Sequence, residues 1–139
     1  MGRYNELMLV LNNYQLINEF EEILEEELEK DIKKYPDLPK DYIEFLREVG
    51  WGDIEIDTCL SIFHGVIETE VIYKRKIKEI QGILYFGDYV VGDCYCGFAI
   101  NDNWRIVEIY DDFQIRIADE NFEGYIKSTI SKYINTVTR

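Results

Sequence analysis

The topology of this chain follows from residues 82–117, which read GILYFGDYVVGDCYCGFAINDNWRIVEIYDDFQIRI. Short apolar runs alternate here with clusters of Gly, Asp and Asn, the residue types that favour tight turns. Strands joined by such short connections pair in an antiparallel manner, because a parallel crossover needs a dozen or more residues. The pattern therefore predicts four consecutive antiparallel strands, at residues 82–86, 95–100, 105–110 and 114–117.

Two further strands are predicted on the N-terminal side of this stretch, at residues 54–57 and 66–73. The end of the second one stays open, because residues 74–78 fit a helix or a loop as well as a strand. All six strands belong to one sheet in this interpretation, and its connections make it mainly a meander.

A long helix is predicted before the strands. Apolar residues recur at steps of three and four from Leu16 to Ile32, and Pro36 stops the run, so the helix should cover residues 14–34. Its opposite face is rich in Glu at the start and in Lys at the end, which complements the helix dipole.

Two more helices complete the prediction. One begins near Pro39, which suits a first helical turn, and ends before Gly50, which suits a C-terminal cap. The other covers residues 120–134, with Asp119 as its N-cap. Helices at both ends of an antiparallel sheet give an α+β domain, and we expect these N-terminal and C-terminal helices to cover one face of the sheet.

The composition describes one folded, strongly acidic domain. The chain of 139 residues fits a single domain, with residues 1–12 as a loosely attached N-terminal segment. Its 28 acidic residues outnumber its 15 Lys and Arg residues, and the formal net charge is −13. This balance argues against binding to nucleic acid or to an anionic membrane surface. A basic protein would be attracted, although the same charge also serves solubility.

The cysteines and the N-terminus favour the cytoplasm. Cys59, Cys94 and Cys96 are odd in number and match no disulfide framework, so reduced thiols are expected. The apolar run at residues 7–11 is too short for a signal peptide, and no run approaches the roughly 20 apolar residues of a membrane span.

Few residues suggest catalysis or metal binding. His64 is the single histidine, so a Ser–His or Cys–His pair would have to use it. Together with Cys59, Cys94 and Cys96 it would make a zinc-type ligand set, but the spacing of the two strand cysteines is not that of a zinc knuckle. We therefore expect buried or solvated side chains, no catalytic set, no metal and no cofactor.

Several aspartates and both tryptophans lie beside predicted turns. The aspartates near strand ends could gather at one rim of the sheet and bind a cation or a basic partner, although each is also an ordinary turn residue. A tryptophan beside a turn is either a core plug or an interface anchor. The candidate partner-binding residues are Trp51, Asp88, Asp93, Trp104, Asp111 and Asp112.

Four segments carry a family resemblance. Residues 38–46, LPKDYIEFL, form a Leu-Pro-x-x-Tyr-x-x-Phe-Leu helix, and residues 83–88, ILYFGD, begin a Gly-Asp hairpin. Residues 106–112, IVEIYDD, give a strand with an acidic end, and residues 117–126, IADENFEGYI, lead into the last helix. In this order, across about residues 36–130, the segments resemble the SUKH superfamily of bacterial immunity proteins and fungal regulators of cell-wall glucan synthesis.

The resemblance implies an α+β fold without a catalytic centre and a role in binding proteins. It departs at residues 49–52, VGWG, where many members have Asn-Gly-Gly, and residues 1–12 and 53–80 have no counterpart. We predict an immunity-type protein that binds a cognate toxin, such as a nuclease, through complementary charge and aromatic anchors. The alternatives are a regulatory or scaffolding domain and a metal-dependent enzyme.

Overall fold

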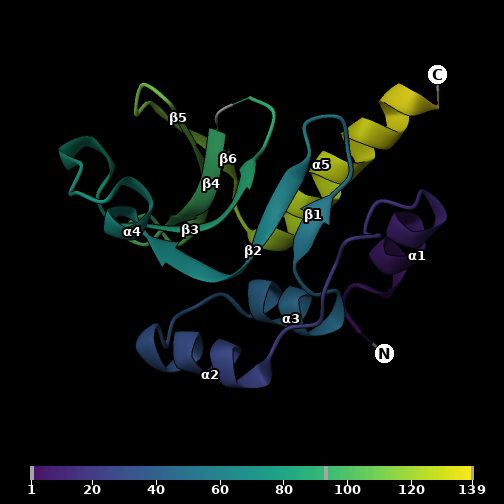
Figure 1. Cartoon of the computed structure of the whole chain (residues 1–139), viewed down its shortest axis with the longest axis horizontal. Helices are drawn as coiled ribbons and strands as arrows, with labels where there is room; N and C mark the ends of the chain where they lie inside the picture. Colours follow the sequence, from purple (N-terminus) through teal and green to yellow (C-terminus); the bar gives the residue numbers. More distant parts are fainter. Residues whose placement is uncertain (1, 93, 139) are drawn as a thin grey trace.

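Six strands form a single antiparallel sheet in the computed structural model, which describes residues 2–92 and 94–138 (Figure 1). Their spatial order β1-β2-β3-β4-β5-β6 follows the chain, so the predicted α+β meander is confirmed. The strands are β1 (Gly52–Ile54), β2 (Leu60–Glu68), β3 (Ile83–Tyr89), β4 (Cys94–Ala99), β5 (Arg105–Tyr110) and β6 (Ile115–Asp119).

The tight hairpins place the later strands where the sequence predicts them. β5 coincides with its predicted range, and β3, β4 and β6 differ from theirs by a few residues. In the turn between β4 and β5, Asn103 and Trp104 both have positive φ angles, of 55° and 58°. The turn spans residues 100–104, and the backbone N–H groups of Asp102 and Trp104 both donate to the carbonyl of Ala99, at 3.0 and 2.9 Å.

The prediction of a strand over residues 66–73 is correct only for residues 66–68. β2 extends from Leu60 to Glu68, and the chain then forms the short helix α4 (Thr69–Tyr73). The Thr69 hydroxyl donates to the carbonyl of Ile80, 3.3 Å away, which ties α4 to the 3-10 helix η1 (Lys78–Ile80). This contact holds the segment after β2 against η1, and the local apolar pattern does not encode it.

Four longer helices accompany the sheet in the described residues, namely α1 (Asn5–Asn13), α2 (Glu25–Lys34), α3 (Lys40–Glu48) and α5 (Phe122–Val137). Figure 1 shows the sheet between α4 on one side and α5 on the other. We call the face toward α5 the inner face and the face toward α4 the outer face. None of the helices in the described ranges is long and apolar enough to cross a membrane.

An aromatic core joins the helices to the inner face. The ring centroid of Phe122, on α5, lies 5.0 Å from that of Phe86 on β3 and 5.2 Å from those of Tyr42 and Phe45 on α3. All four side chains are fully buried. Burying such a ring stabilises the fold by about 1.5–3 kcal/mol, and edge-to-face pairs add to this.

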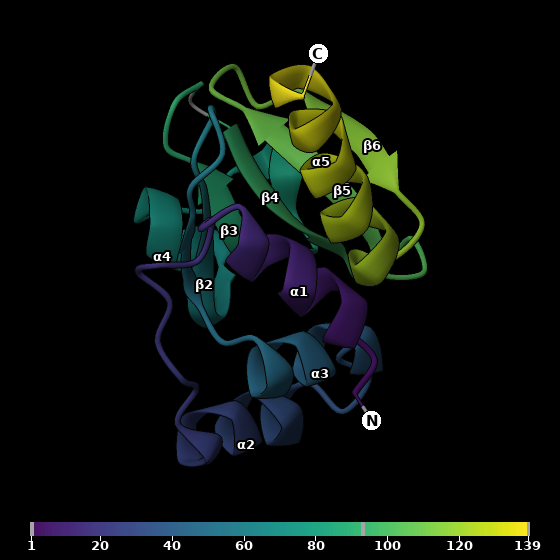
Figure 2. The ribbon, with the colours of Figure 1, turned by 90° about the vertical axis from the view of Figure 1, so that its right-hand side faces the viewer.

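The N-terminal prediction needs two corrections. Residues 1–12 are not a loosely attached segment, because Tyr4, Leu7 and Leu11 are buried in the main core. The Tyr4 hydroxyl also donates to the backbone carbonyl of Asp41 on α3, at 2.7 Å. Figure 2 shows α1 beside α5 on the inner side of the sheet.

The predicted helix over residues 14–34 is correct only from Glu25 onward. Gln15 has a positive φ of 55°, and the chain then runs in a non-helical conformation to the edge of the sheet, where Glu21 and Trp51 exchange backbone hydrogen bonds of 2.9 and 3.0 Å. Apolar residues such as Leu16 therefore reach the core from an extended segment. Tertiary packing here overrides a helical pattern.

The last helix begins two residues later than predicted. Its N-cap is Asn121, whose side-chain oxygen accepts a hydrogen bond of 2.7 Å from the backbone N–H of Gly124. Asp119, the predicted cap, instead accepts from the N–H of Glu120 at the end of β6. Asn121 has extended backbone angles, as an N-cap requires.

Candidate protein-binding surface

A row of side chains crosses the outer face from β1 to β6. Residues directly opposite one another in antiparallel strands point to the same face, and Tyr95 pairs with both Asp88 and Ile109. Ile109 belongs to the cluster of buried apolar residues beneath α4, so this is the outer face. The complete row is Asp53, Ser61, Asp88, Tyr95, Ile109 and Ile115.

The acidic half of this row lacks a counter-charge. Asp53 and Asp88 are both partly buried and are separated by Ser61 on β2. Burial, and secondarily the negative charge of Asp53, raises the pKa of Asp88. None of the ion pairs between described residues includes either carboxylate. A cation placed between them would relieve both the desolvation cost and the repulsion.

Four aromatic rings pack together on the side of Asp88 that faces away from Asp53, with Tyr95 directly opposite Asp88. Tyr85 and Tyr95 project from the sheet, whereas Tyr73 comes from α4 and Phe113 from the turn between β5 and β6. Their centroids lie 5.5 to 6.3 Å apart in edge-to-face pairs. The Arg75 guanidinium lies 6.0 Å from the centroid of Phe113, so this cluster already holds one cation against a ring.

The rings and carboxylates enclose a groove of about 400 Å³ at the end of the outer face. We call it the aromatic groove, and its principal lining residues are Tyr73, Asp88, Tyr95, Asp111 and Phe113. The mixture of apolar rings with a few carboxylates is typical of a surface that receives a Lys or Arg side chain.

A second hollow of about 530 Å³ adjoins the groove at the β1–β2 side of the sheet. Trp51, Asp53 and His64 line it, and the Trp51 and His64 rings meet edge to face with centroids 5.5 Å apart. Nδ1 of His64 lies 3.4 Å from the carboxylate of Glu27 on α2. The hollow extends the acidic, aromatic character of the groove toward the sheet edge.

The structure brings together most, but not all, of the predicted binding residues. Asp88 and Asp111 line the aromatic groove, and Trp51 lines the hollow next to it. Asp112 is exposed in the adjoining turn, where its carboxylate accepts from the backbone N–H of Gln114 at 3.1 Å. Asp93 lies outside the described residues.

Trp104 is separate from this surface. It lies in the turn between β4 and β5, at the opposite end of these strands from the turn that carries Asp111 and Asp112. Its partly buried ring packs on the buried Phe98, with centroids 5.8 Å apart, against the main core. The residue therefore fits the core-plug interpretation of a turn tryptophan.

The sequence interpretation misses Asp53, Tyr73, Tyr95 and Phe113. Only Tyr95 carries a usable signal, because Cys94 and Cys96 share one face of a strand and the residue between them must point to the other face. Strand register places Asp53 in the same row as Asp88, in the second hollow. Tyr73 and Phe113 reach the groove from a helix and a turn whose positions depend on long-range packing.

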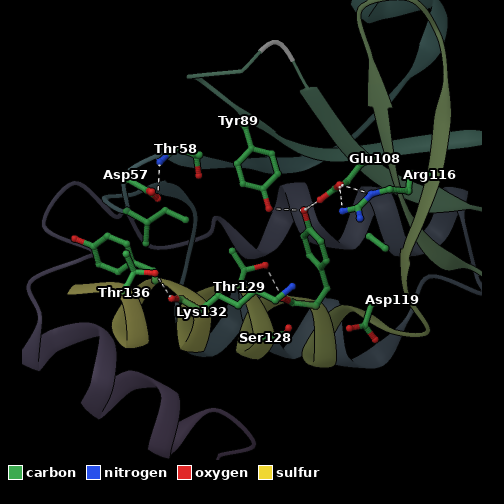
Figure 3. Close-up of a pocket in the computed structure, with 14 residues that line it drawn as sticks. Asp57, Thr58, Tyr89, Glu108, Arg116, Asp119, Ser128, Thr129, Lys132 and Thr136 are labelled. Carbon is green, nitrogen blue, oxygen red and sulfur yellow. Dashed lines mark hydrogen bonds and ion pairs between the residues drawn. The ribbon is translucent and has the colours of Figure 1, made fainter. Parts of the chain in front are cut away.

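A buried polar network lies on the inner face, in a cleft of about 250 Å³ between α5 and the sheet (Figure 3). Glu108 is only 7% exposed and accepts hydrogen bonds from Tyr125 (2.8 Å), Tyr110 (3.1 Å) and Arg116 (2.6 Å). The hydroxyls of Tyr89 and Tyr125 are 2.5 Å apart, and burial raises the pKa of Tyr89 to about 12. Because both Glu108 oxygens are engaged, the network ties α5 to β3, β5 and β6.

The residues of the zinc alternative are not brought together. Cys96 is fully buried on the inner face, whereas His64 is exposed beside Trp51 and Glu27. Burial, followed by the charge of Glu108, raises the pKa of Cys94 to about 12, so this thiol stays protonated. Across residues 2–92 and 94–138, no group of three His, Cys, Asp or Glu side chains is arranged to hold a metal ion.

Comparison of the chain with protein-family models, with curated proteins and with solved structures gives no match. The resemblance to the SUKH superfamily therefore stays a prediction that rests on the quoted segments.

Proposed function

We propose that this chain is a protein-binding domain of the immunity type, which neutralises a cognate toxin by binding it directly through the aromatic groove. The observation that carries the proposal is the partly buried pair of Asp53 and Asp88, which share one row of the outer face and have no counter-ion among the described residues. Asp88 lines the aromatic groove and is directly opposite Tyr95. A structural acidic pair would be expected to hold an internal Lys or Arg. An acidic pair without an internal counter-ion can instead bind a Lys or Arg side chain that a partner protein supplies.

The energetics favour a Lys or Arg side chain of the partner. A cation held against a tyrosine or phenylalanine ring contributes about 0.5–2 kcal/mol. Hydrogen bonds to a charged carboxylate such as Asp88 contribute about 1.5–3 kcal/mol each. Aromatic side chains lose little conformational entropy when they are immobilised, so Tyr73, Tyr95 and Phe113 suit the role of anchors.

The overall charge supports the same partner. A net charge of −13 attracts a basic protein over long distances and speeds its encounter with the domain. A toxin that acts on nucleic acid must itself present a basic cleft to phosphates. Covering that cleft with an acidic surface would block its substrate. The proposal places this encounter in the cytoplasm, in keeping with three free cysteines.

The test is affinity capture from a lysate of the source cell, followed by calorimetric titration of any stoichiometric partner and assay of its activity. We expect one basic toxin domain that binds with nanomolar affinity and is inhibited. Asp88→Asn should weaken binding at least tenfold. The matched control is Asp37→Asn, which removes the same charge from an exposed turn between α2 and α3 and should leave affinity nearly unchanged.

Two results would overturn the proposal. Equal affinities for Asp88→Asn, Asp37→Asn and the unaltered chain would remove the aromatic groove from the interface. Several weak partners in place of one tight one would favour the regulatory or scaffolding role.

A further inference from the structure

One edge of the sheet is open and the other is closed. β1 is covered by the segment that precedes α2, through the two backbone hydrogen bonds between Glu21 and Trp51. β6 pairs with β5 alone among the described residues. Figure 2 shows β6 at the margin of the sheet, with α5 lying over the inner face. An uncovered edge presents backbone N–H and C=O groups that another strand can pair with.

The register identifies which backbone groups face outward. The N–H of Tyr110 donates to the carbonyl of Gln114 at 3.0 Å, and Ile109 is opposite Ile115 in the next pair. Hydrogen-bonded and non-hydrogen-bonded pairs alternate along an antiparallel ladder. The N–H and C=O groups of Ile115 and Ile117 therefore point away from β5, toward the free edge.

The side chains of the same two residues are exposed apolar groups. Ile115 is 42% exposed and Ile117 is 50% exposed, on the outer face. Their neighbours on β5, Ile109 and Val107, are buried. Natural edge strands usually carry charges, prolines or bulges that prevent pairing. β6 has the charged Arg116 and a register irregularity after Ile117, but the two exposed isoleucines that flank Arg116 favour pairing.

The charges at the two ends of β6 argue against a second copy of the chain as occupant. Antiparallel pairing of two β6 strands centred on Arg116 would place Asp112 of one copy opposite Glu120 of the other, and Arg116 opposite its equivalent. Like charges directly opposite one another destabilise a strand pair. Each copy also carries a net charge of −13. A strand with basic ends and an apolar centre fits instead.

We propose that the β6 edge binds an extended strand of a basic protein by strand addition. The backbone of the added strand pairs with Ile115 and Ile117, and its β-branched side chains cover these two isoleucines on the outer face. Its Lys or Arg residues meet Asp111 and Asp112 at one end of β6 and Glu120 at the other. This inference rests on the proposed function in taking a basic protein as partner, but it concerns a surface beside the aromatic groove.

The test uses the acetylated, amidated heptapeptide KTVTVTK as a probe. We expect it to shift the backbone NMR signals of β6 and to slow hydrogen exchange of the Ile115 and Ile117 amides. Methylating the two valine nitrogens removes the donors of the added strand and should weaken binding at least tenfold. The peptide ETVTVTE, which has the same backbone and centre, should also bind at least tenfold more weakly.

Two variants of the protein separate the backbone from the side chain. Ile117→Pro removes the outward N–H without removing a bond to β5, and should weaken binding of KTVTVTK at least tenfold. Ile117→Thr keeps the N–H and the β-branched shape, and should retain most of the affinity. Thermal unfolding checks both variants, and if Ile117→Pro does not fold, the comparison of methylated with unmethylated peptide decides alone.

Three outcomes would overturn the inference: no binding of KTVTVTK, equal binding of its methylated form, or signal shifts confined to other strands. Concentration-dependent self-association that perturbs the β6 amides would make a second copy the occupant and would equally overturn it. Failure here is distinct from failure of the proposed function. A captured partner that depends on Asp88 would uphold that function even if the peptide does not bind.

Discussion

Glu108 is a carboxylate in an otherwise apolar layer of side chains. Its neighbours on the inner face of the sheet include Cys96 and Ile106, which are fully buried. The desolvation cost of the carboxylate is offset by hydrogen bonds from Tyr110, Arg116 and Tyr125. Such a network stabilises only while its buried members stay paired, because Glu108 or Tyr125 left alone is a buried polar group without a partner.

Glu108→Gln should therefore lower the free energy of unfolding by about 1–3 kcal/mol. The amide has one acceptor oxygen in place of two, and its NH2 group would face the donor groups of Tyr110, Arg116 or Tyr125. Urea unfolding at neutral pH measures the change. The control is Glu120→Gln on the exposed surface, which should change stability by less than about 0.5 kcal/mol. Equal effects of the two substitutions would show that the network contributes nothing.

The charged carboxylate of Asp88 is proposed to strengthen partner binding, but it lowers the stability of the folded domain. Burial and the charge of Asp53 raise its pKa, so the folded state binds this proton more tightly than the unfolded state does. The contribution of Asp88 to stability should then fall as pH rises from the unfolded pKa of about 3.9 through the higher folded value.

Asp88→Asn removes this penalty, so we expect a higher urea midpoint than that of the unaltered chain at pH 7 and a flatter dependence of stability on pH in the acid range. Unfolding curves at several pH values between about 3 and 7 measure both effects. A lower midpoint at pH 7 would mean that the carboxylate is held by favourable contacts, and would contradict an open cation site.

At the scale of single elements, α1 shows how a short N-terminal helix becomes part of the core. Tyr4 packs edge to face on Phe45 of α3, with ring centroids 5.3 Å apart. The backbone N–H of Tyr4 also donates to the side chain of Glu48 at 2.9 Å. Isolated helices of this length are marginal in water, so packing rather than helix propensity holds α1 in place.

Two leucines of α1 allow a matched test. Leu11 is fully buried and Leu9 is 65% exposed. Leu11→Ala should destabilise the domain by about 2–5 kcal/mol through lost burial and a residual cavity, whereas Leu9→Ala should change stability by less than about 0.5 kcal/mol. Thermal or urea unfolding measures both changes. A loss of stability below about 0.5 kcal/mol for Leu11→Ala would show that α1 is only loosely attached.

At the scale of the whole molecule, charge is the dominant property. Excess negative charge acts over distances of the order of the Debye length, about 10 Å at 0.1 M salt, so it influences encounter more than the docked complex. The acidic groups of the groove act at short range instead. The two effects can be separated kinetically.

Raising sodium chloride from about 50 to 500 mM should slow association with a basic partner at least tenfold and should change the dissociation rate much less. Stopped-flow fluorescence can follow both rates, with the two tryptophans as reporters. Asp88→Asn should mainly speed dissociation. An association rate independent of salt would show that the net charge plays no part in recognition.

The hairpins from β3 to β6 could be predicted because their causes are local. Turn residues such as those at 101–104 lie next to the apolar runs that they separate, and alternation along each strand assigns its two faces. The α+β class follows from the same pattern. Local signals are reliable wherever the energy that selects the structure comes from residues close together in the chain.

The candidate binding surface depends on contacts between distant residues. Asp53 and Asp88 share one row of the outer face only through the register of β1, β2 and β3. Tyr73 packs on Phe113 only because α4 and a turn fold onto the same face. The extended path of residues 14–24 has a similar origin, since pairing with Trp51 and burial of Leu16 outweigh a helical pattern. Periodicity shows which residues seek burial, but the partner against which they are buried is selected by the packing of the complete chain.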